Sequence, residues 1–346
     1  MDESLLLQEI LEQPAALGRL LDEGREGIRA AAAAIRDYDP AFVTIAARGS
    51  SDNAARYGQY LLGAHNGLAV GLATPSLFSV YDRPPRLARS LVIGISQSGQ
   101  SPDIVAVLRA GREQGALTLA ISNDGQSPLA QTAEHCILLH CGPERSVAAT
   151  KTYSSSLLAI ALLDAELAGA TERLELLATL PRQVQSLCDR AGEYREVGEA
   201  QADMDSCVVL SRGYNYATAF EIALKLKELG YVLAEPWSSA DFQHGPVALV
   251  EQGFALLAIV PSGPLAPILT DRLGEMRERG ARLLVISAQP EALALAHARL
   301  PLPDLPEWAS PLAAVIPGQF FALGLTQAKG LDVDRPRGLR KVTRTR

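Results

Sequence analysis

The chain contains an internal duplication, and this feature constrains its fold more than any other. Three pairs of segments align when the sequence is shifted by 164 or 165 residues: Val43–Gly49 with Val208–Gly213, Ser98-Gly99 with Ser262-Gly263, and Gly115–Ser122 with Gly280–Ser287. Because the three matches occur in the same order along the chain, they indicate two copies of one structural unit.

Each copy shows the pattern of a strand, a turn and a helix. In the first copy, the apolar run Leu91–Ile95 is followed by a Ser/Gly-rich turn and then by the helical spacing of Ile104, Val107 and Leu108. Buried strands that alternate with helices of this length are typical of a parallel sheet with helices on both faces. The sequence therefore predicts an α/β fold built from two three-layer units.

The predicted organisation has five parts. They are a helical lead-in over residues 1–24, the first unit over 25–168, a helical connector over 169–202, the second unit over 203–330 and a tail over 331–346. Ligands of such sheets bind at the carboxyl ends of the strands, where the turns lie. We therefore expect the functional residues in these turns.

Composition narrows the class of protein. The chain has 346 residues and a net charge of −7, and its Lys and Arg residues cluster nowhere before the last dozen residues, which argues against a nucleic-acid partner. Apolar runs such as Leu157–Leu163 are too short to span a membrane, and the acidic N-terminus does not resemble a secretory signal. We expect a cytoplasmic protein with reduced cysteines.

His135-Cys136 and His140-Cys141 carry residue types that bind metal ions. The stretch from Cys136 to His140 has the composition of a buried strand, and in a strand residues five apart point to opposite faces. Core packing is therefore the favoured interpretation, and we expect no metal.

The turn Ser96–Ser101 has the chemistry of a phosphate site. It follows a strand directly, Ser101 suits the N-cap position, and Pro102 suits the first helical position. A helix N-terminus offers free N–H groups, and the Ser hydroxyls and Gln97 add donors. The equivalent turn at 262–267 lacks most of this polarity, so only the first copy is equipped for an anion. A capped turn that binds only water is the alternative.

Two further polar turns have the same ambiguity. The first, Arg48–Asn53, brings Ser50 and Ser51 between a strand and a helix, where their hydroxyls would complete the phosphate site. The second, Pro143–Lys151, precedes an apolar helix. Gly and Ser populate many turns, so neither segment is specific by itself.

Three features offer proton or imine chemistry. On a helix predicted over 217–229, Glu221, Lys225 and Glu228 fall on one stripe, for which an exposed ladder of ion pairs is the alternative. His244 lies in a turn and suits acid–base catalysis, with a plain surface residue as the alternative. Lys341 suits a Schiff base if it is desolvated, with a frayed basic tail as the alternative.

The order of these motifs resembles a tandem pair of sugar isomerase (SIS) domains, as in the isomerase half of glucosamine-6-phosphate synthase. The resemblance covers almost the whole chain. It rests on six segments in order: Glu9–Pro14, Ser96–Gly99, Ala148–Lys151, Ala223–Glu228, His244–Pro246 and Asp334–Arg337 with Lys341.

The resemblance implies a role for each matching residue. Phosphate would be bound by Ser51, Ser96, Gln97, Ser98 and Ser101, with Ser50 and Val147 beside them. Glu228 would be the base that moves a proton between C1 and C2, and Lys225 a supporting charge. His244 would open the sugar ring from the neighbouring subunit, which implies a homodimer, and Lys341 would form an imine with the open sugar. No cofactor is implied.

Departures from the synthase pattern point to another activity. Asp2 stands where the synthase glutaminase domain has its cysteine, so we expect no glutamine-dependent synthesis. Leu77 replaces a Glu, Ala149 a Ser and Arg48 a Cys. Three segments are closer to stand-alone glucosamine-6-phosphate deaminases: Arg48–Asp52, Pro143–Thr150 and Leu339–Thr343.

The predicted reaction therefore converts an amino-hexose 6-phosphate to fructose 6-phosphate and ammonia. Two alternatives stay open at this point. One is another enzyme with the same fold, either an aldose–ketose phosphate isomerase or a deaminase or deglycase of a different amino sugar. The other is a sugar-phosphate sensor without chemistry.

Overall fold

The computed structural model describes residues 4–341, which form two compact units. The N-terminal unit comprises residues 12–145, 151–181 and 340–341, and the C-terminal unit comprises residues 4–11, 146–150 and 182–339. Residues 1–3 of the predicted lead-in and residues 342–346 of the predicted tail lie outside the described residues. The predicted domain boundaries stay a prediction.

The N-terminal unit is built on a parallel five-stranded sheet with the order β2-β1-β3-β4-β5. Its strands are β1 (Phe42–Ala46), β2 (Val70–Leu72), β3 (Ser90–Ile95), β4 (Leu117–Ser122) and β5 (His135–Leu138). Every residue of β3 and β4 is buried, as expected for central strands covered on both faces.

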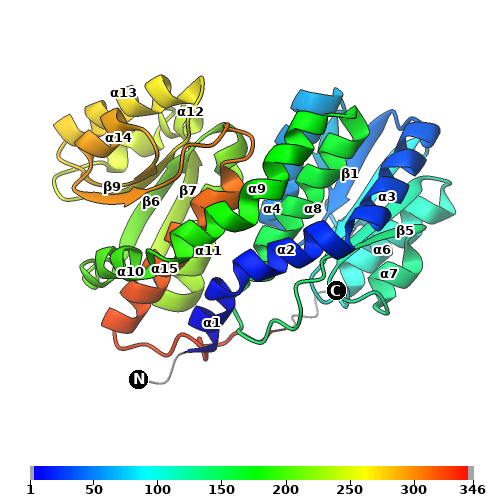
Figure 1. Ribbon diagram of the computed structural model, residues 1–346, viewed down its shortest axis with the longest axis horizontal. Coiled ribbons are helices and arrows are strands. Elements are labelled where there is room, and N and C mark those ends of the chain that lie inside the picture. The colour runs from blue at the N-terminus through cyan, green and yellow to red at the C-terminus, as the bar shows by residue number, and fades with distance from the viewer. Residues whose placement is uncertain (1–3, 342–346) are drawn as a thin grey trace. The chain divides into compact units, whose positions relative to one another are not determined.

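Helices cover both faces of this sheet (Figure 1). They are α2 (Gln13–Glu23), α3 (Arg25–Tyr38), α4 (Ser50–Asn66), α5 (Ser76–Ser79), α6 (Pro102–Glu113), α7 (Pro128–Thr132) and α8 (Lys151–Ala168). Alternate residues of β1 face opposite layers. Ile45 contacts the α4 side, where a Cβ on Gly58 would lie 3.2 Å from it, and Ala46 packs in the cluster with Ile104 and Leu108 of α6. Helix α9 (Thr171–Cys188) begins in this unit and ends in the other.

The C-terminal unit repeats this architecture with the strand order β10-β9-β8-β6-β7, again all parallel. Its strands are β6 (Ser206–Ser211), β7 (Leu233–Ser238), β8 (Ala255–Val260), β9 (Arg282–Ser287) and β10 (Ala298–Pro301). Its helices are α1 (Leu5–Leu11), α10 (Ala191–Glu199), η1 (Gly213–Asn215), α11 (Tyr216–Gly230), α12 (Ser239–Phe242), η2 (Pro246–Leu249), α13 (Leu265–Glu278), α14 (Pro290–Leu295) and α15 (Pro311–Ala328).

The two sheets have the same topology, strand for strand. In each, the chain moves from its first strand to one edge and then returns to the other side of that strand. The direction of winding therefore reverses between β1 and β3 in one sheet and between β6 and β8 in the other. Such switch points open a crevice at the carboxyl ends of the strands, which is where ligands bind in open α/β sheets. The prediction of a duplicated α/β fold is confirmed.

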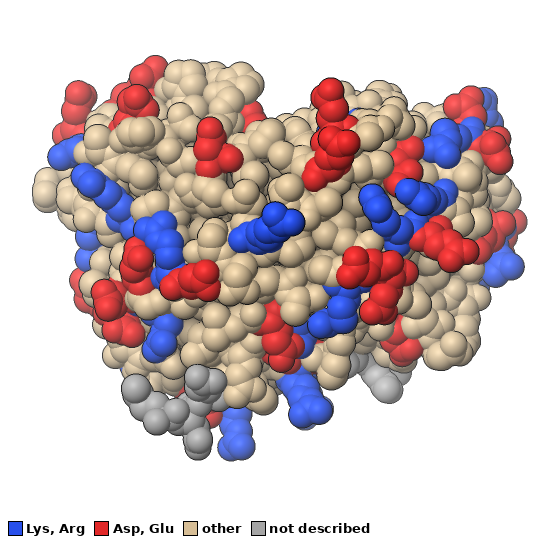
Figure 2. Space-filling model, in the orientation of Figure 1, with Lys and Arg blue, Asp and Glu red and all other residues tan. Residues whose placement is uncertain are grey.

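Charged side chains of both signs are interspersed over the face shown in Figure 2, and on that face the described Lys and Arg residues form no continuous basic area. Among residues 4–341, no helix is both long and apolar enough to cross a membrane.

Candidate active site

The turn after β3 carries its serines in a fixed conformation. Gly99 has a φ of 60°, and its N–H donates to Ser96 Oγ at 3.1 Å. The N–H of Gln100 donates to Ser98 Oγ at 3.3 Å. A hydroxyl that accepts one bond still has its own hydrogen to donate. The turn therefore orders Ser96 and Ser98 while leaving each a donor for an anion.

The next turn of the sheet supports this one. The N–H of Asn123 donates to the carbonyl of Gln97 at 3.1 Å, and the N–H of Leu129 donates to the carbonyl of Gly99 at 3.1 Å. A Cβ on Gly99 would lie 2.1 Å from Ser127 Oγ, so only glycine fits here. Backbone contacts on both sides make this a preorganised turn.

Helix α6 begins where the sequence predicts it. Ser101 occupies the N-cap position with extended backbone, and Pro102 is the first helical residue. Ser101 is thus at the N-cap position as predicted, but its side chain makes no capping hydrogen bond. Asp103 Oδ1 instead accepts the N–H of Ile104 at 3.0 Å.

An ion pair links the turn after β1 to this helix start. Arg48 Nε lies 2.9 Å from Asp103 Oδ2, and the Asp103 side chain is fully buried while that of Arg48 is 49% exposed. Since β1 and β3 are neighbours, Arg48 brings a cation to the switch point, where Ser50 and Ser51 also begin α4. The sequence places Arg48 in a polar turn and in a deaminase-like segment, but it predicts no phosphate contact for its guanidinium. Arg48 and Asp103 are 55 residues apart in the sequence, so no short sequence motif indicates that they pair.

The segment 146–150 belongs to the C-terminal unit and is held by the first helix of the chain. The carboxylate of Glu9, which is only 4% exposed, accepts the N–H of Ser146 at 3.1 Å and also contacts Ser146 Oγ. This contact fixes the backbone beside Val147, whose side chain is half-buried.

The charged stripe on α11 is buried. Lys225 Nζ lies 3.4 Å from Glu221 Oε1 and 2.7 Å from Glu228 Oε2, and the three side chains are 1%, 0% and 24% exposed respectively. The alternative of an exposed ladder is therefore wrong for Glu221 and Lys225. Burial opposes the charge of Lys225, but the two carboxylates outweigh it and raise the pKa of Lys225 above 10.5.

Glu228 is the member of the stripe that reaches solvent. Its carboxylate is held by the buried ammonium of Lys225, which defines its position, and the Glu228 side chain is 24% exposed. A fixed, accessible carboxylate is what a general base requires.

His244 and Lys341 lie in different units. His244 is exposed in the turn between α12 and η2 of the C-terminal unit, where its backbone N–H donates to the backbone carbonyl of Asp241 at 2.9 Å. Lys341 is in the N-terminal unit, and its Nζ lies 2.6 Å from Glu144 Oε2. Glu144 is buried and also accepts two bonds from Thr152. Lys341 is thus anchored rather than frayed, in contrast to the basic-tail alternative.

The predicted site residues therefore form two groups. The N-terminal unit holds the serine turns with Arg48 and Lys341, and the C-terminal unit holds Val147, Lys225, Glu228 and His244. The roles of these residues stay predictions.

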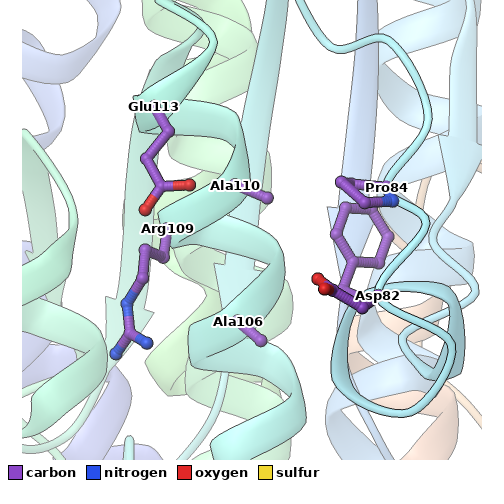
Figure 3. A pocket seen from close by; sticks show the side chains of 7 residues that line it. Asp82, Pro84, Ala106, Arg109, Ala110 and Glu113 are labelled. Carbon is purple, nitrogen blue, oxygen red and sulfur yellow. The ribbon is translucent and has the colours of Figure 1, made fainter.

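Two cavities lie away from these groups, one in each unit. One, of about 190 Å³, is lined by Phe78, Asp82, Pro84, Ala106, Arg109, Ala110 and Glu113. In Figure 3, Ala106 and Ala110 face Pro84 across the gap, whereas Arg109 and Glu113 extend along the other side of α6. This cavity lies along the outer face of a helix and includes none of the predicted site residues. A second, open cavity lies between α10 and the start of β10.

Cys136 and Cys141 are free thiols. Burial, with the nearby carboxylates adding to it, raises the pKa of Cys136 to about 11 and that of Cys141 to about 12. Between residues 4 and 341, no group of three or more His, Cys, Asp or Glu side chains is arranged to hold a metal ion.

Comparison with known proteins places both units in one family. The SIS domain model matches residues 40–164 and 202–325, so the chain belongs to the SIS domain family. It is 33% identical over 345 residues to the glutamine–fructose-6-phosphate aminotransferase (isomerizing) of Thermococcus kodakarensis, a match that covers 97% of this chain and 57% of that protein. The chain thus spans little more than half the length of this relative.

Two solved structures share the fold. One, a candidate phosphosugar isomerase from Silicibacter pomeroyi, is 35% identical with a TM-score of 0.87, over 96% of this chain and all of that chain. The other, a glucosamine-6-phosphate deaminase from Thermotoga maritima, is 20% identical with a TM-score of 0.77, over 99% of this chain and all of that chain. The second likeness concerns the fold alone.

Proposed function

We propose that this protein is a glucosamine-6-phosphate deaminase. The reaction consumes one water and converts the amino sugar phosphate to fructose 6-phosphate and ammonia. The observation that carries the proposal is the buried Lys225, which holds the accessible Glu228 carboxylate on α11. A protein that only senses a sugar phosphate has no need for a carboxylate held in this way.

In this proposal the serine turns bind the phosphate. Ser96, Ser98 and Ser101 follow β3 at the switch point, and Ser50 and Ser51 begin the neighbouring helix α4. Arg48 adds a guanidinium to the same edge of the sheet. Hydroxyl and helix N-terminal N–H donors with one cation suit a phosphate monoester. Gln97 and Val147 complete the proposed set.

The chemistry moves a proton from C2 to C1 and breaks one C–N bond. His244 opens the sugar ring, which gives a C1 aldehyde beside the C2 amine. Glu228 takes the C2 proton and returns it at C1, while O1 gains a proton and the amine nitrogen loses one, so that C1 carries a hydroxyl and the amine becomes a C2 imine. Water adds to this imine, the C–N bond breaks, and ammonia leaves fructose 6-phosphate. Lys225 fixes Glu228, and Lys341 stabilises or binds the open sugar.

We further propose that the protein acts as a homodimer. His244 is exposed in a turn, and the family resemblance assigns its role to substrate bound by a second copy. The arrangement requires at least two chains for turnover.

A sugar-phosphate isomerase is the second candidate. The similarity to the candidate phosphosugar isomerase, 35% identical over almost the whole chain, favours it. The same base serves both reactions, because isomerisation also moves a proton between C1 and C2. The two differ in whether C2 carries an amine or a hydroxyl.

Parallel assays on purified protein separate these candidates. Glucosamine 6-phosphate, galactosamine 6-phosphate and glucose 6-phosphate are incubated separately, and ammonia and ketose phosphate are measured. The proposal predicts ammonia and fructose 6-phosphate in equal amounts from the first substrate. Ketose formation from glucose 6-phosphate alone would favour the isomerase. A further reaction containing fructose 6-phosphate and glutamine controls for synthesis, and formation of glucosamine 6-phosphate there would contradict the proposal.

A further inference from the structure

At the switch point of the second sheet, the two turns have the same backbone conformation as the turns of the proposed phosphate site, but a side chain of the chain itself lies between them. Gly213 follows β6 and Gly263 follows β8, with φ angles of 64° and 106°. Each lies 164 residues after its counterpart in the first sheet, Gly49 and Gly99, which also have positive φ. The duplication therefore placed the same pair of turns at the same place in both units.

A carboxylate of the chain itself occupies the second crevice. A Cβ on Gly213 would lie 2.9 Å from Glu307 Oε1, and a Cβ on Gly263 would lie 3.1 Å from Glu307 Oε2. The backbone N–H of Leu265, the first residue of α13, lies close enough to this carboxylate to oppose the rise in its pKa that burial causes. Glu307 thus reaches both glycine turns and the start of the helix that follows β8.

The first unit provides the matched comparison. A Cβ on Gly49 would meet no atom of the described residues within 4 Å, whereas the same addition at Gly213 meets Glu307. The turn after β8 has Pro261 and Pro264 where the turn after β3 has Gln97 and Gln100. The turns after β3 and β8 are both filled, because a Cβ on Gly99 would lie 2.1 Å from the Ser127 hydroxyl and one on Gly263 would lie 3.1 Å from the Glu307 carboxylate. The two copies therefore differ at Gly49 and Gly213, and in having a hydroxyl or a carboxylate beside the second glycine.

The second crevice also has the wrong charge for phosphate. Asp304 Oδ1 contacts Ser262 Oγ, the hydroxyl that corresponds to Ser98 in the first unit. Two carboxylates therefore lie at this switch point, and both repel an anion. Burial raises the pKa of Glu307, and the N–H of Leu265 partly opposes this effect.

Glu307 is also tied to the helix that carries Glu228. The Ser310 hydroxyl donates to the Glu307 carbonyl at 2.8 Å and accepts from Asn215 Nδ2 at 2.6 Å. Asn215 ends η1, and its Oδ1 accepts from Thr218 of α11 at 2.9 Å. The backbone at Glu307 is therefore linked to the start of α11, and this link does not involve the Glu307 carboxylate.

We propose that Glu307 is an internal anion that closes a second phosphate-type site, so that the C-terminal unit takes no phosphate until this carboxylate is removed. The ligand class of the opened site is inorganic phosphate or a phosphate monoester. The proposal goes beyond the deaminase function and does not depend on it.

The test counts phosphate bound per chain. Wild type, Glu307→Ala, Glu307→Gln and the double variant Glu307→Ala/Asp304→Asn are titrated calorimetrically with inorganic phosphate. Glu307→Ala and the double variant are expected to bind one phosphate more than wild type, and the double variant more tightly. Glu307→Gln is expected to match wild type, because its amide still fills the crevice. An unchanged count in both alanine variants would overturn the proposal.

The measured quantity is the number of phosphates bound by each variant minus the number bound by wild type. The test therefore does not depend on whether the site of the N-terminal unit binds inorganic phosphate. Failure of the deaminase proposal is recognised separately, as the absence of ammonia release from glucosamine 6-phosphate, and leaves the difference in phosphate count unaffected. As a second measurement, the tryptophan-fluorescence unfolding midpoint is followed in phosphate and in sodium chloride at equal ionic strength. Both tryptophans, Trp237 and Trp308, lie in the C-terminal unit.

A phosphate-specific rise in the midpoint of Glu307→Ala that wild type lacks supports the proposal, and an equal rise in both opposes it. Glu307→Ser provides a second, smaller replacement should the alanine variant not fold. The phosphate count and the unfolding midpoint of Glu307→Ser are then compared with those of wild type in the same way.

Discussion

Replacement of Lys225 by Met tests the buried charges on α11 most sharply. The methionine side chain has a similar length and no charge, so the change removes the cation and preserves most of the packing. Glu221, which is fully buried, then loses the ammonium that lies 3.4 Å from it, and Glu228 loses the one at 2.7 Å.

The size of the effect follows from these distances. At an effective dielectric constant of about 20, the two attractions amount to roughly 5 and 6 kcal/mol before the cost of removing the charges from water. That cost offsets much of the gain, but loss of one partner from a buried ion pair typically costs about 3–5 kcal/mol of the free energy of unfolding. We expect Lys225→Met to lie in this range.

The same helix offers a matched control. Lys227 is 40% exposed, and its Nζ lies 3.9 Å from Glu235 Oε1. An exposed pair of this kind contributes about 0–1 kcal/mol. Lys227→Met therefore removes the same charge from the same helix, with an expected loss below about 1 kcal/mol.

Urea unfolding followed by tryptophan fluorescence measures both variants, because Trp237 and Trp308 report on the unit that contains α11. If Lys225→Met were as stable as Lys227→Met at pH 7, the account of the buried stripe would be wrong.

The pH dependence has a definite sign. The pKa of Lys225 is raised in the folded state above 10.5. Its contribution to stability is therefore complete below pH 10.5 and is lost as the pH rises through the folded-state value. Wild type is expected to lose stability above pH 10.5 more steeply than Lys225→Met.

Two further predictions concern the site. Arg48→Met is expected to raise KM for the sugar phosphate about 10- to 100-fold with a smaller change in kcat, because a hydrogen bond to a charged group contributes about 1.5–3 kcal/mol. Steady-state kinetics measure both constants. An unchanged KM would show that Arg48 does not belong to the phosphate site. Mixing the inactive variants His244→Ala and Glu228→Gln is expected to restore activity. If His244 acts on substrate bound by the other chain, a mixed dimer contains one site with both intact residues. No recovery of activity after subunit exchange would mean that His244 and Glu228 of the same chain act in the same site.

The fold was largely predictable because the duplication is recorded in the strands and turns themselves. Matches such as Gly115–Ser122 with Gly280–Ser287 fall on strands that occupy the same place in the two sheets, β4 and β9. The serine turn after β3 was predictable for the same reason, since its position relative to a strand follows from local sequence.

Burial and long-range pairing were not predictable. The spacing of Glu221, Lys225 and Glu228 is identical in an exposed ladder and in a buried one. The packing of α11 against β6, β7 and α15 decides between them. Arg48 meets Asp103 across 55 residues, and Glu307 meets Gly213 across a still longer separation. Contacts of this kind depend on the tertiary structure of the folded unit, so no local sequence pattern predicts them.

The central claim is that Glu228 moves the proton in an amino-sugar phosphate deaminase. The most direct measurement is ammonia release from glucosamine 6-phosphate by wild type and by Glu228→Gln, with binding of the sugar phosphate measured on the same preparations. The account predicts ammonia release by wild type, and in Glu228→Gln a loss of release with binding nearly unchanged. Full activity in Glu228→Gln, or no ammonia from wild type, would contradict it.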